Sequence, residues 1–353
     1  MSDVLDNENI LKQRDPEGAL GISAGQYTQA AFEATVKEES HDGREIKTLV
    51  LSGMGGSALA ALIAKVWLKD ALTIPFEIVR GYDLPNYVDA NTLVIASSYS
   101  GNTEETLSSL QQAKERGAQI GIIASGGKLI EAANEHSIAH AHMSVSTVPT
   151  GLQPRMAMIY NLKALTALLE NFGIVSGKSS EINALSDWLE SESTQWAATV
   201  PTERNYAKQI AEEAVGKTPV FYGGAITAPL AYKWKISWNE TGKNLAFWNE
   251  FPEFNHNEFM GWTSHPVEKP FVIFDLMSSF EHPQILKRFE ISDRLLSGKR
   301  PKAIQIQLKG DTPLAQLLWG AILADFSSIY LAVLNGVDPT PVELIEKLKK
   351  ELV

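Results

Sequence analysis

Short apolar runs rich in β-branched residues alternate with helical segments along most of this chain. In the first half, the strand-like runs lie at 48–52, 75–79, 92–97, 119–124 and 140–145. The helical segments lie at 58–69, 103–116, 129–135 and 154–171. Strands that alternate with helices form a parallel sheet whose two faces are both covered by helices. The chain is therefore predicted to be an α/β protein.

The same order of elements begins again in the second half, after helices expected at 181–196 and 203–213. The strands predicted there lie at 219–222, 270–276 and 303–308. The helices predicted there lie at 228–240, 284–296, 314–334 and 341–352. A strand, a Gly-Gly turn and a helix occur both at 49–62 and at 220–232. This weak internal repeat predicts two related α/β domains in tandem.

These patterns divide the chain into four parts. Residues 1–45, with an amphipathic helix over 26–37 and no strand signal, are predicted to form an N-terminal helical extension. The first α/β domain is expected at 46–175. A glycine- and serine-rich stretch then leads into a linker helix at 176–200. The second α/β domain, with a C-terminal helix, is expected at 201–353.

Composition and charge narrow the class of function. A net charge of −11, from 31 basic and 42 acidic residues, argues against binding to nucleic acid or to an anionic membrane. The chain has no cysteine, so thiolate catalysis and cysteine metal sites are excluded. The first residues lack the apolar core of a signal peptide, and polar residues interrupt the apolar segment 314–334. We expect a cytoplasmic protein in which that segment is a buried helix.

The stretch 97–105, Ser-Ser-Tyr-Ser-Gly-Asn-Thr-Glu-Glu, links a predicted buried strand to a helix. The free N–H groups and the positive dipole end of that helix face the loop. Four polar side chains surround the glycine, those of Ser98, Ser100, Asn102 and Thr103. A capped helix start needs only one such hydroxyl. We therefore interpret the loop as a receptacle for a dianionic phosphate group.

Two further loops follow predicted strands of the first half. Gly-Met-Gly-Gly-Ser at 53–57 stands where ligands of open α/β sheets bind, but it lacks the G-x-G-x-x-G spacing of a dinucleotide site. It is either an anion-binding turn that includes Ser57 or a tight packing turn. The loop 147–155 ends at Arg155, near the start of a helix. This guanidinium either faces an anion or forms a surface ion pair.

Two titratable residues stand out in the second half. Glu240 ends a predicted helix and is near Trp234, Trp238 and Leu245 in the sequence. A carboxylate beside apolar walls has a raised proton affinity, which suits a general base near neutral pH. The alternative is an ordinary surface glutamate. His256, between two asparagines, is either an acid/base group for ring opening or a structural histidine.

A metal site is not predicted. His140 and His142 share a face of the same predicted strand, whereas His136 precedes it. No nearby carboxylate completes a set of three convergent ligands. Lys349, in the tail helix, is on pattern alone an ordinary solvent-exposed lysine.

Taken together, these stretches resemble the bifunctional phosphoglucose/phosphomannose isomerases. That family belongs to the sugar-isomerase-domain (SIS) proteins of the phosphoglucose isomerase superfamily. The resemblance runs from about residue 45 to the end and rests on 53–57, 98–103, 149–155, 239–240, 255–256 and 336–349. The serine-rich loop marks any SIS domain, whereas the glutamate, the histidine and the tail lysine in one two-domain chain narrow the resemblance.

The resemblance implies two tandem SIS domains, each a five-stranded parallel sheet flanked by helices, and a homodimer. It implies interconversion of glucose 6-phosphate and mannose 6-phosphate with fructose 6-phosphate through a cis-enediolate, without metal or other cofactor. This reaction belongs to carbohydrate metabolism, in glycolysis and gluconeogenesis. By the same resemblance, the substrate phosphate is held by Gly56, Ser57, Ser98, Ser100 and Thr103.

The resemblance also implies catalytic roles. Glu240 moves the proton between C1 and C2, and Arg155 stabilises the enediolate charge. His256, supplied across the dimer, and Lys349 assist ring opening, with Lys347 and Lys350 as the alternative amines. Two other functions stay open. One is an isomerase specific for a single or amino sugar phosphate, and the other is a non-catalytic regulator that binds a sugar phosphate.

Overall fold

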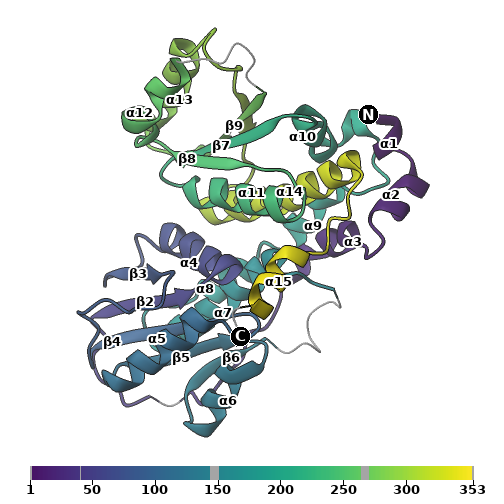
Figure 1. The fold of residues 1–353 in the computed structure, drawn as a ribbon. Helices are drawn as coiled ribbons and strands as arrows, with labels where there is room; N and C mark the ends of the chain where they lie inside the picture. Colours follow the sequence, from purple (N-terminus) through teal and green to yellow (C-terminus); the bar gives the residue numbers. More distant parts are fainter. Residues whose placement is uncertain (1, 40, 144–150, 264–269, 352–353) are drawn as a thin grey trace. The chain divides into compact units, whose positions relative to one another are not determined.

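The computed structural model describes residues 2–39, 41–143, 151–263 and 270–351. It contains two compact units. The first unit is Gln26–Trp188, and the second joins Met1–Gly25 to Leu189–Val353. The segments that we expected as an N-terminal extension and a linker helix are thus each divided between the two units. Figure 1 shows a sheet with flanking helices in each unit.

The first unit is built on a six-stranded sheet in the order β1-β6-β5-β4-β2-β3. Its strands are β1 (Val36–Lys37), β2 (Thr48–Gly53), β3 (Phe76–Val79), β4 (Thr92–Ser97), β5 (Gln119–Ala124) and β6 (Ala139–His142). Its helices are η1 (Gln26–Gln29), α4 (Gly55–Trp67), α5 (Glu104–Glu115), α6 (Gly127–Glu135), η2 (Pro154–Met156), α7 (Met158–Asn171) and α8 (Lys178–Asn183). Strands β2 to β6 are parallel, and β1 pairs with β6 in the antiparallel direction.

Helices cover both faces of this sheet, as the alternating pattern predicts. On one face, Val94 and Ala96 pack with Leu110 and Ala113 of α5. The other face is covered by α7, because a Cβ on Gly121 would lie 3.4 Å from the side chain of Leu168 in that helix. The five parallel strands agree with the expectation of a five-stranded parallel sheet for this domain.

The second unit is built on a four-stranded sheet in the order β10-β9-β7-β8, and all described strand pairs are parallel. Its strands are β7 (Thr218–Gly223), β8 (Phe247–Glu250), β9 (Phe271–Met277) and β10 (Ile304–Gln307). Its main helices are α10 (Tyr206–Ala214), α11 (Ala228–Glu240), α13 (Pro283–Leu295) and α14 (Pro313–Asn335). Its shorter helices are α1 (Ser2–Leu5), α2 (Glu8–Arg14), α3 (Ala19–Ala24), α9 (Ser186–Thr194, which begins in the first unit), η3 (Thr202–Arg204), α12 (Phe254–Asn257), η4 (Phe259–Thr263) and α15 (Glu343–Glu351).

The expectation of five strands is wrong for the described part of this second sheet. After β10 the chain enters α14 directly, and Pro339 and Pro341 then lead into α15 instead of into another strand. Proline has no N–H for a strand ladder, so this segment is a poor strand. The pattern also missed β8, whose four residues are exposed or half-buried and show no apolar alternation.

The two sheets share one topology. In each, the first parallel strand (β2 or β7) lies between the second and the third, which are β3 and β4 or β8 and β9. Gly53 pairs with Ser97 in one sheet, and Gly223 pairs with Leu276 in the other. The internal repeat seen in the sequence is therefore a repeat of fold.

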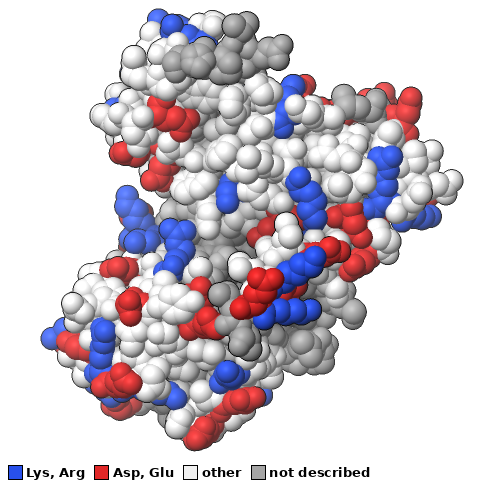
Figure 2. Space-filling model, viewed as in Figure 1, with Lys and Arg blue, Asp and Glu red and all other residues white. Residues whose placement is uncertain are grey.

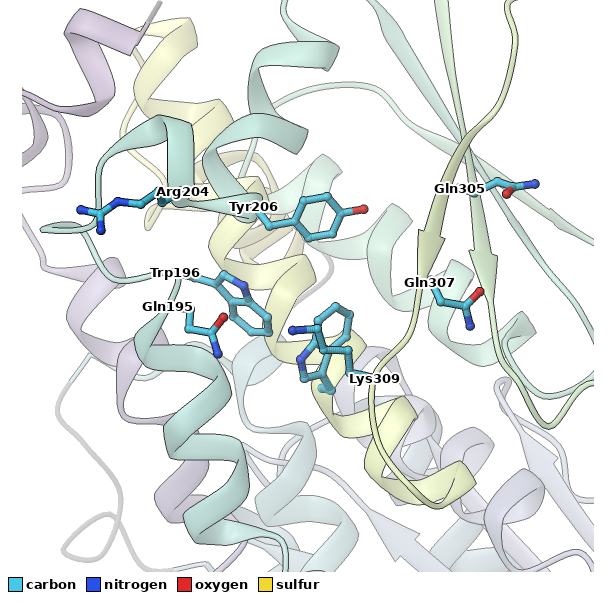
Figure 3. Close-up of a pocket in the computed structure, with 8 residues that line it drawn as sticks. Gln195, Trp196, Arg204, Tyr206, Gln305, Gln307 and Lys309 are labelled. Carbon is cyan, nitrogen blue, oxygen red and sulfur yellow. The ribbon is translucent and has the colours of Figure 1, made fainter.

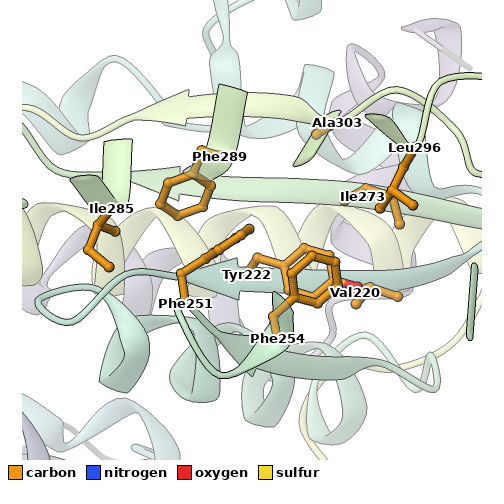
Figure 4. Packing of buried hydrophobic residues seen from close by; sticks show 9 residues of the cluster. All are labelled: Val220, Tyr222, Phe251, Phe254, Ile273, Ile285, Phe289, Leu296 and Ala303. Carbon is orange, nitrogen blue, oxygen red and sulfur yellow. The ribbon is translucent and has the colours of Figure 1, made fainter. Parts of the chain in front are cut away.

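A buried aromatic core holds the second unit together. On one face of its sheet, Phe221 and Phe274 pack against Trp234 and Trp238 of α11. The cluster in Figure 4 consists of Val220, Tyr222, Phe251, Phe254, Ile273, Ile285, Phe289, Leu296 and Ala303. Helix α14 is long and apolar enough to cross a membrane, but 94% of its most apolar window is buried inside the protein. It is the buried helix that we expected.

The prediction of a helix over 26–37 is wrong. Residues 26–29 form the single turn η1, and Val36 pairs with Ala141 as part of β1. The side chain of Gln29 explains the early stop. Its amide donates to the carbonyl of Met156 (2.9 Å) and accepts from the N–H of Tyr160 (3.3 Å), so tertiary bonds fix the turn.

The face of the molecule in Figure 2 carries charged side chains of both signs. On the described residues of the face in Figure 2, lysine and arginine side chains alternate with aspartate and glutamate side chains.

Candidate active site

The predicted phosphate-binding residues gather at the carboxyl edge of the first sheet. Strands β2 and β4 are neighbours, and their last residues, Gly53 and Ser97, are paired. From β2 the chain goes to β3 on one side, whereas β4 leads to β5 on the other. This is the point where the strand order reverses, at which open α/β sheets bind their ligands. We call the loops 53–57 and 98–103 together the first junction.

Hydroxyl groups converge in the first junction. The Oγ of Ser98 lies 2.7 Å from Oγ1 of Thr103 and 3.4 Å from Oγ of Ser100. The N–H of Gly101 donates to the Oγ of Ser98 (3.2 Å), and the N–H of Asn102 donates to the Oγ of Ser100 (3.3 Å). Ser98 is buried, Thr103 is half-buried and Ser100 is exposed. The loop therefore presents a graded set of hydroxyls, from its floor to the solvent.

Thr103 does not cap the helix that follows it. It occupies the N-cap position of α5, yet its side chain makes no capping hydrogen bond and instead meets Ser98. Met54, at the N-cap of α4, has no side-chain cap either. Both helices thus lack a side-chain cap at their N-termini, the ends that favour anions. This geometry weakens the alternative that 97–105 is only a capped turn.

Two glycines hold the first junction in place through close backbone contacts. Gly101 has φ +73°, and a Cβ there would lie 1.8 Å from the carbonyl oxygen of Gly126. A Cβ on Gly56 would lie 2.5 Å from the carbonyl oxygen of Pro154. Gly56 therefore serves at least to let the η2 turn approach α4. Gly126 is not among the predicted site residues, although a Gly-Gly pair just after a strand was the available signal.

The same close approach brings Arg155 to the first junction. The Cα of Arg155 lies 3.7 Å from the position that a Cβ of Gly56 would take. Arg155 is 3% exposed, and Ser57, in the first turn of α4, is 5% exposed. A guanidinium buried to this extent is not an ordinary surface side chain. Pro149 and Thr150, which belong to the same motif, lie outside the described residues.

Glu240 is the last residue of α11 in the second unit, and it is half-buried. Its surroundings differ from the apolar walls that we expected. Trp234 and Trp238 face the sheet, and Leu245 is 63% exposed. Residues two apart on a helix point to nearly opposite sides, so Trp238 cannot wall in Glu240. The expectation of an apolar environment from these neighbours in sequence is wrong.

The end of α11 is fixed by backbone contacts. The side chain of Asn239 accepts from the N–H of Ala246 (2.9 Å) and donates to its carbonyl (3.3 Å). The ammonium of Lys243 donates to the carbonyl of Glu240 (2.5 Å). These bonds position the residue that we expected as the base, and no local pattern in the sequence predicted a role for Asn239 or Lys243 in them.

His256 lies in α12, just after β8, and its side chain is exposed. Its neighbours in sequence hold it firmly. Phe254 is fully buried in the cluster of Figure 4. Asn255 donates to Oγ of Ser292 (2.8 Å) and accepts from Arg288 (3.0 Å). The imidazole is thus presented outward from a rigid support.

Glu240 and His256 lie at opposite edges of the second sheet. Helix α11 starts near the carboxyl end of β7 and runs back along the strands, so Glu240 lies at their amino edge. His256 follows the carboxyl end of β8. A helix of 13 residues spans about 20 Å, which is the scale of the separation.

The remaining predicted residues give less information. Lys349 belongs to α15, but its side chain lies outside the described part of the chain, whereas Lys347 and Lys350 are exposed. His140 and His142 meet the backbone carbonyls of Ile138 (2.8 Å) and Ser125 (3.2 Å).

A separate pocket of about 280 Å³ lies in the second unit and contains none of the predicted site residues. Figure 3 shows it between Gln305 and Gln307 of β10 and the segment around Trp196 and Tyr206. Its lysine, Lys309, donates to Glu192 (3.2 Å).

Comparison with known proteins bears on both units. The family described as "SIS domain" matches residues 44–170, and the family described as "Bacterial phospho-glucose isomerase C-terminal SIS domain" matches residues 203–352. A bifunctional phosphoglucose/phosphomannose isomerase of Caldicellulosiruptor bescii is 38% identical over 87% of this chain and 90% of its own. One of Aquifex aeolicus is 34% identical over 95% of this chain and 98% of its own.

Solved structures agree on the fold. A glucose-6-phosphate isomerase-like protein from Thermus thermophilus superposes with a TM-score of 0.66 over 98% of both chains, at 17% identity. The α/β class and the two SIS domains are therefore confirmed. With this fold and with relatives of 34% and 38% identity over most of its length, the chain belongs to the family of the bifunctional phosphoglucose/phosphomannose isomerases.

Proposed function

We propose that this protein is an aldose–ketose isomerase that interconverts glucose 6-phosphate and mannose 6-phosphate with fructose 6-phosphate. The observation that carries the proposal is the first junction, where Ser98 and Thr103 turn their hydroxyls toward each other beside uncapped helix N-termini. Family membership supports the same substrate class. The phosphate lies away from the reacting carbons, so its binding energy orients them.

The chemistry needs one base and one stabiliser of negative charge. In the open-chain aldose, the Glu240 carboxylate takes the proton from C2, the C2–H electrons form the C1–C2 double bond, and charge develops on O1. The protonated Glu240 returns the proton to C1, the proton of the O2 hydroxyl passes to O1, and a carbonyl forms at C2. Arg155 is the proposed stabiliser of the enediolate. Glucose and mannose 6-phosphate differ only at C2, so both give the same cis-enediolate.

We assign His256 and Lys349 to ring opening, with His256 supplied by a second copy of the chain. The location of Glu240 and His256 at opposite edges of one sheet supports this assignment. One chain cannot bring both to a single small sugar, whereas an isologous dimer can exchange them. A homodimer in the cytoplasm, acting in glycolysis and gluconeogenesis, is part of the proposal.

Subunit mixing tests the dimer. Glu240→Gln and His256→Ala proteins should each be poorly active. After subunit exchange at equal amounts, half of the dimers are hybrids with one complete site of two, so about a quarter of wild-type activity should return. No recovery, with exchange verified by mass, would place both residues in the same chain.

A coupled assay on three substrates tests the function itself. With EDTA present, both aldose 6-phosphates should yield fructose 6-phosphate. Turnover of only one aldose, or of glucosamine 6-phosphate, would instead support the alternative of a single or amino sugar isomerase. Tight binding without turnover would support a regulator, and loss of activity with EDTA would contradict a metal-free reaction.

A further inference from the structure

The second unit contains a junction built like the first. We call the loop 223–227 after β7 and the loop 278–281 after β9 the second junction. It lies at the carboxyl edge of neighbouring strands, where Gly223 and Leu276 are paired, and α11 begins there. The loops leave the sheet at the same point of the topology as those of the first junction.

A carboxylate of the chain itself occupies the second junction. Oε1 of Glu281 accepts hydrogen bonds from the N–H of Ile226 (2.7 Å) and of Thr227 (3.1 Å). The N–H of Ala225 also lowers the pKa of this carboxyl group. Successive backbone N–H groups therefore surround one anion, as in the backbone nests that bind phosphate. Glu281 is 4% exposed, so solvent hardly reaches this anion.

The fit between Glu281 and the loop is close. A Cβ on Gly224 would lie 2.5 Å from the carboxylate, so glycine is needed for the carboxylate to rest there. Gln316 of α14 holds the other loop through Oγ of Ser278 (2.7 Å) and Oγ of Ser279 (2.9 Å). The position of the carboxylate is thus fixed by both loops of the second junction.

One feature shows that the nest is not ideally matched to a carboxylate. The second oxygen of Glu281, Oε2, is buried without a hydrogen-bond partner among the described residues. Burial raises the pKa of Glu281, whereas the N–H groups of Ile226 and Thr227 lower it. A buried acceptor without a partner costs free energy.

We propose that the second junction is an oxyanion-binding site that Glu281 fills as an internal ligand. The side chain closes the second SIS domain to phosphate groups and leaves one open phosphate site in each chain. Removal of the carboxylate would open the nest to a tetrahedral oxyanion such as phosphate or sulfate. Inorganic phosphate is the probe for this site, so its binding can be measured whether or not the isomerase assignment holds.

Equilibrium dialysis with labelled inorganic phosphate tests the proposal on the full chain at constant ionic strength. Glu281→Ala should bind one more phosphate per chain than the wild type. Phosphate should also raise its Tm more than that of the wild type, whereas chloride should not. The first junction is the same in both proteins, so its contribution cancels in the comparison.

Glu258→Ala is the matched control. Glu258 is also a partly buried glutamate of the second unit, but it accepts from the side chains of Tyr222 and Asn249 (2.7 Å to the latter) rather than from successive backbone N–H groups. It should gain no phosphate site. Equal phosphate binding by wild type and Glu281→Ala would overturn the proposal.

If Glu281→Ala fails to fold in the absence of phosphate, its refolding only when phosphate or sulfate is present supports the proposal.

Glu281→Gln is a second variant, which keeps the nest filled with a neutral group. It should gain no phosphate site. A phosphate site gained by Glu281→Gln as well would show that the filling side chain does not block the nest.

Discussion

The two junctions of this chain have one topology and opposite contents. The first offers hydroxyls and uncapped helix ends, whereas in the second a buried glutamate already occupies the equivalent position. One side chain in the loop after the third strand makes the difference. Duplication of a fold thus preserves the place where a ligand can bind, and single residues decide whether that place is available.

The largest expected effect is on kcat, and it distinguishes Glu240, the last residue of α11, from Glu281, whose carboxylate lies at the N-terminus of the same helix. Glu240→Gln should lower kcat by about 10²–10⁴-fold, because it removes the proposed base. Glu281→Gln should leave kcat unchanged and cost ~1 kcal/mol of stability, because a charge at a helix N-terminus is lost. Steady-state kinetics and urea unfolding measure both. Full turnover by Glu240→Gln would refute the assignment of the base.

The second-largest expected effect is a dependence of stability on pH, and it arises from Asp275, a buried residue inside strand β9. Where β4 has Ala96, β9 has Asp275, which is 1% exposed and has no hydrogen-bond partner on either carboxyl oxygen among the described residues. Burial raises its pKa to about 7, and Arg300 opposes the rise. The folded state then binds more protons than the unfolded state between about pH 4 and pH 7, so this group lowers stability as pH rises through that window.

Replacement of that group tests the sign. From pH 4 to pH 8, the unfolding free energy of Asp275→Asn relative to wild type should rise by roughly 2–4 kcal/mol. Asp311→Asn, at an exposed aspartate, should show no such trend. A flat difference for Asp275→Asn would mean that Asp275 ionises normally in the fold.

The two junction threonines provide a matched pair. Thr103→Val should raise KM about tenfold and change kcat much less, because the lost hydroxyl is proposed to bind the phosphate and not the reacting carbons. Thr227 accepts from the N–H of Gly224 (2.8 Å) and donates to the carbonyl of Leu276 (2.8 Å). Thr227→Val should therefore lower stability by about 1–3 kcal/mol and leave KM unchanged. A KM effect from Thr227→Val would show that the second junction is open.

The smallest expected effect is a difference in KM between alanine variants of the two serines of the loop 98–103. Ser98→Ala should raise KM more than it lowers kcat, because Ser98 is buried at the centre of the hydroxyl cluster. Ser100 is exposed and touches the cluster only at 3.4 Å, so Ser100→Ala should raise KM less than about threefold. Equal effects from both would contradict the graded arrangement.

Local patterns were sufficient to predict the elements that build the sites. The strands 92–97 and 119–124 and the helix 228–240 have the predicted bounds, because apolar runs and polar breaks coincide there. The loop 98–103 could be interpreted from its own side chains. Strand β8 could not be predicted, because its pairing with β7 rather than its composition defines it.

The content of the second junction could not be predicted in the same way. Glu281 bonds to residues 54 and 55 positions earlier, and no local pattern marks such a pair. The prediction of an apolar environment for Glu240 failed for a related reason, because neighbours in sequence were taken as neighbours in space. A helix places residues two apart on opposite sides, and the sheet, not Glu240, received both tryptophans.

The division of the second unit has a consequence for synthesis on the ribosome. Residues 2–25 of this unit are made before residues 26–188, but their partners in the unit are made after them. Arg14 donates to the carbonyl of Val333 (2.6 Å), and Asp6 pairs with Lys208 (3.0 Å). Residues 26–188 leave the exit tunnel as a complete unit before residues 2–25 have the partners that bury Leu5 and Leu11. The nascent chain therefore completes the packing of residues 2–25 only after α14 has emerged, and a truncation before that helix leaves this segment without its partners.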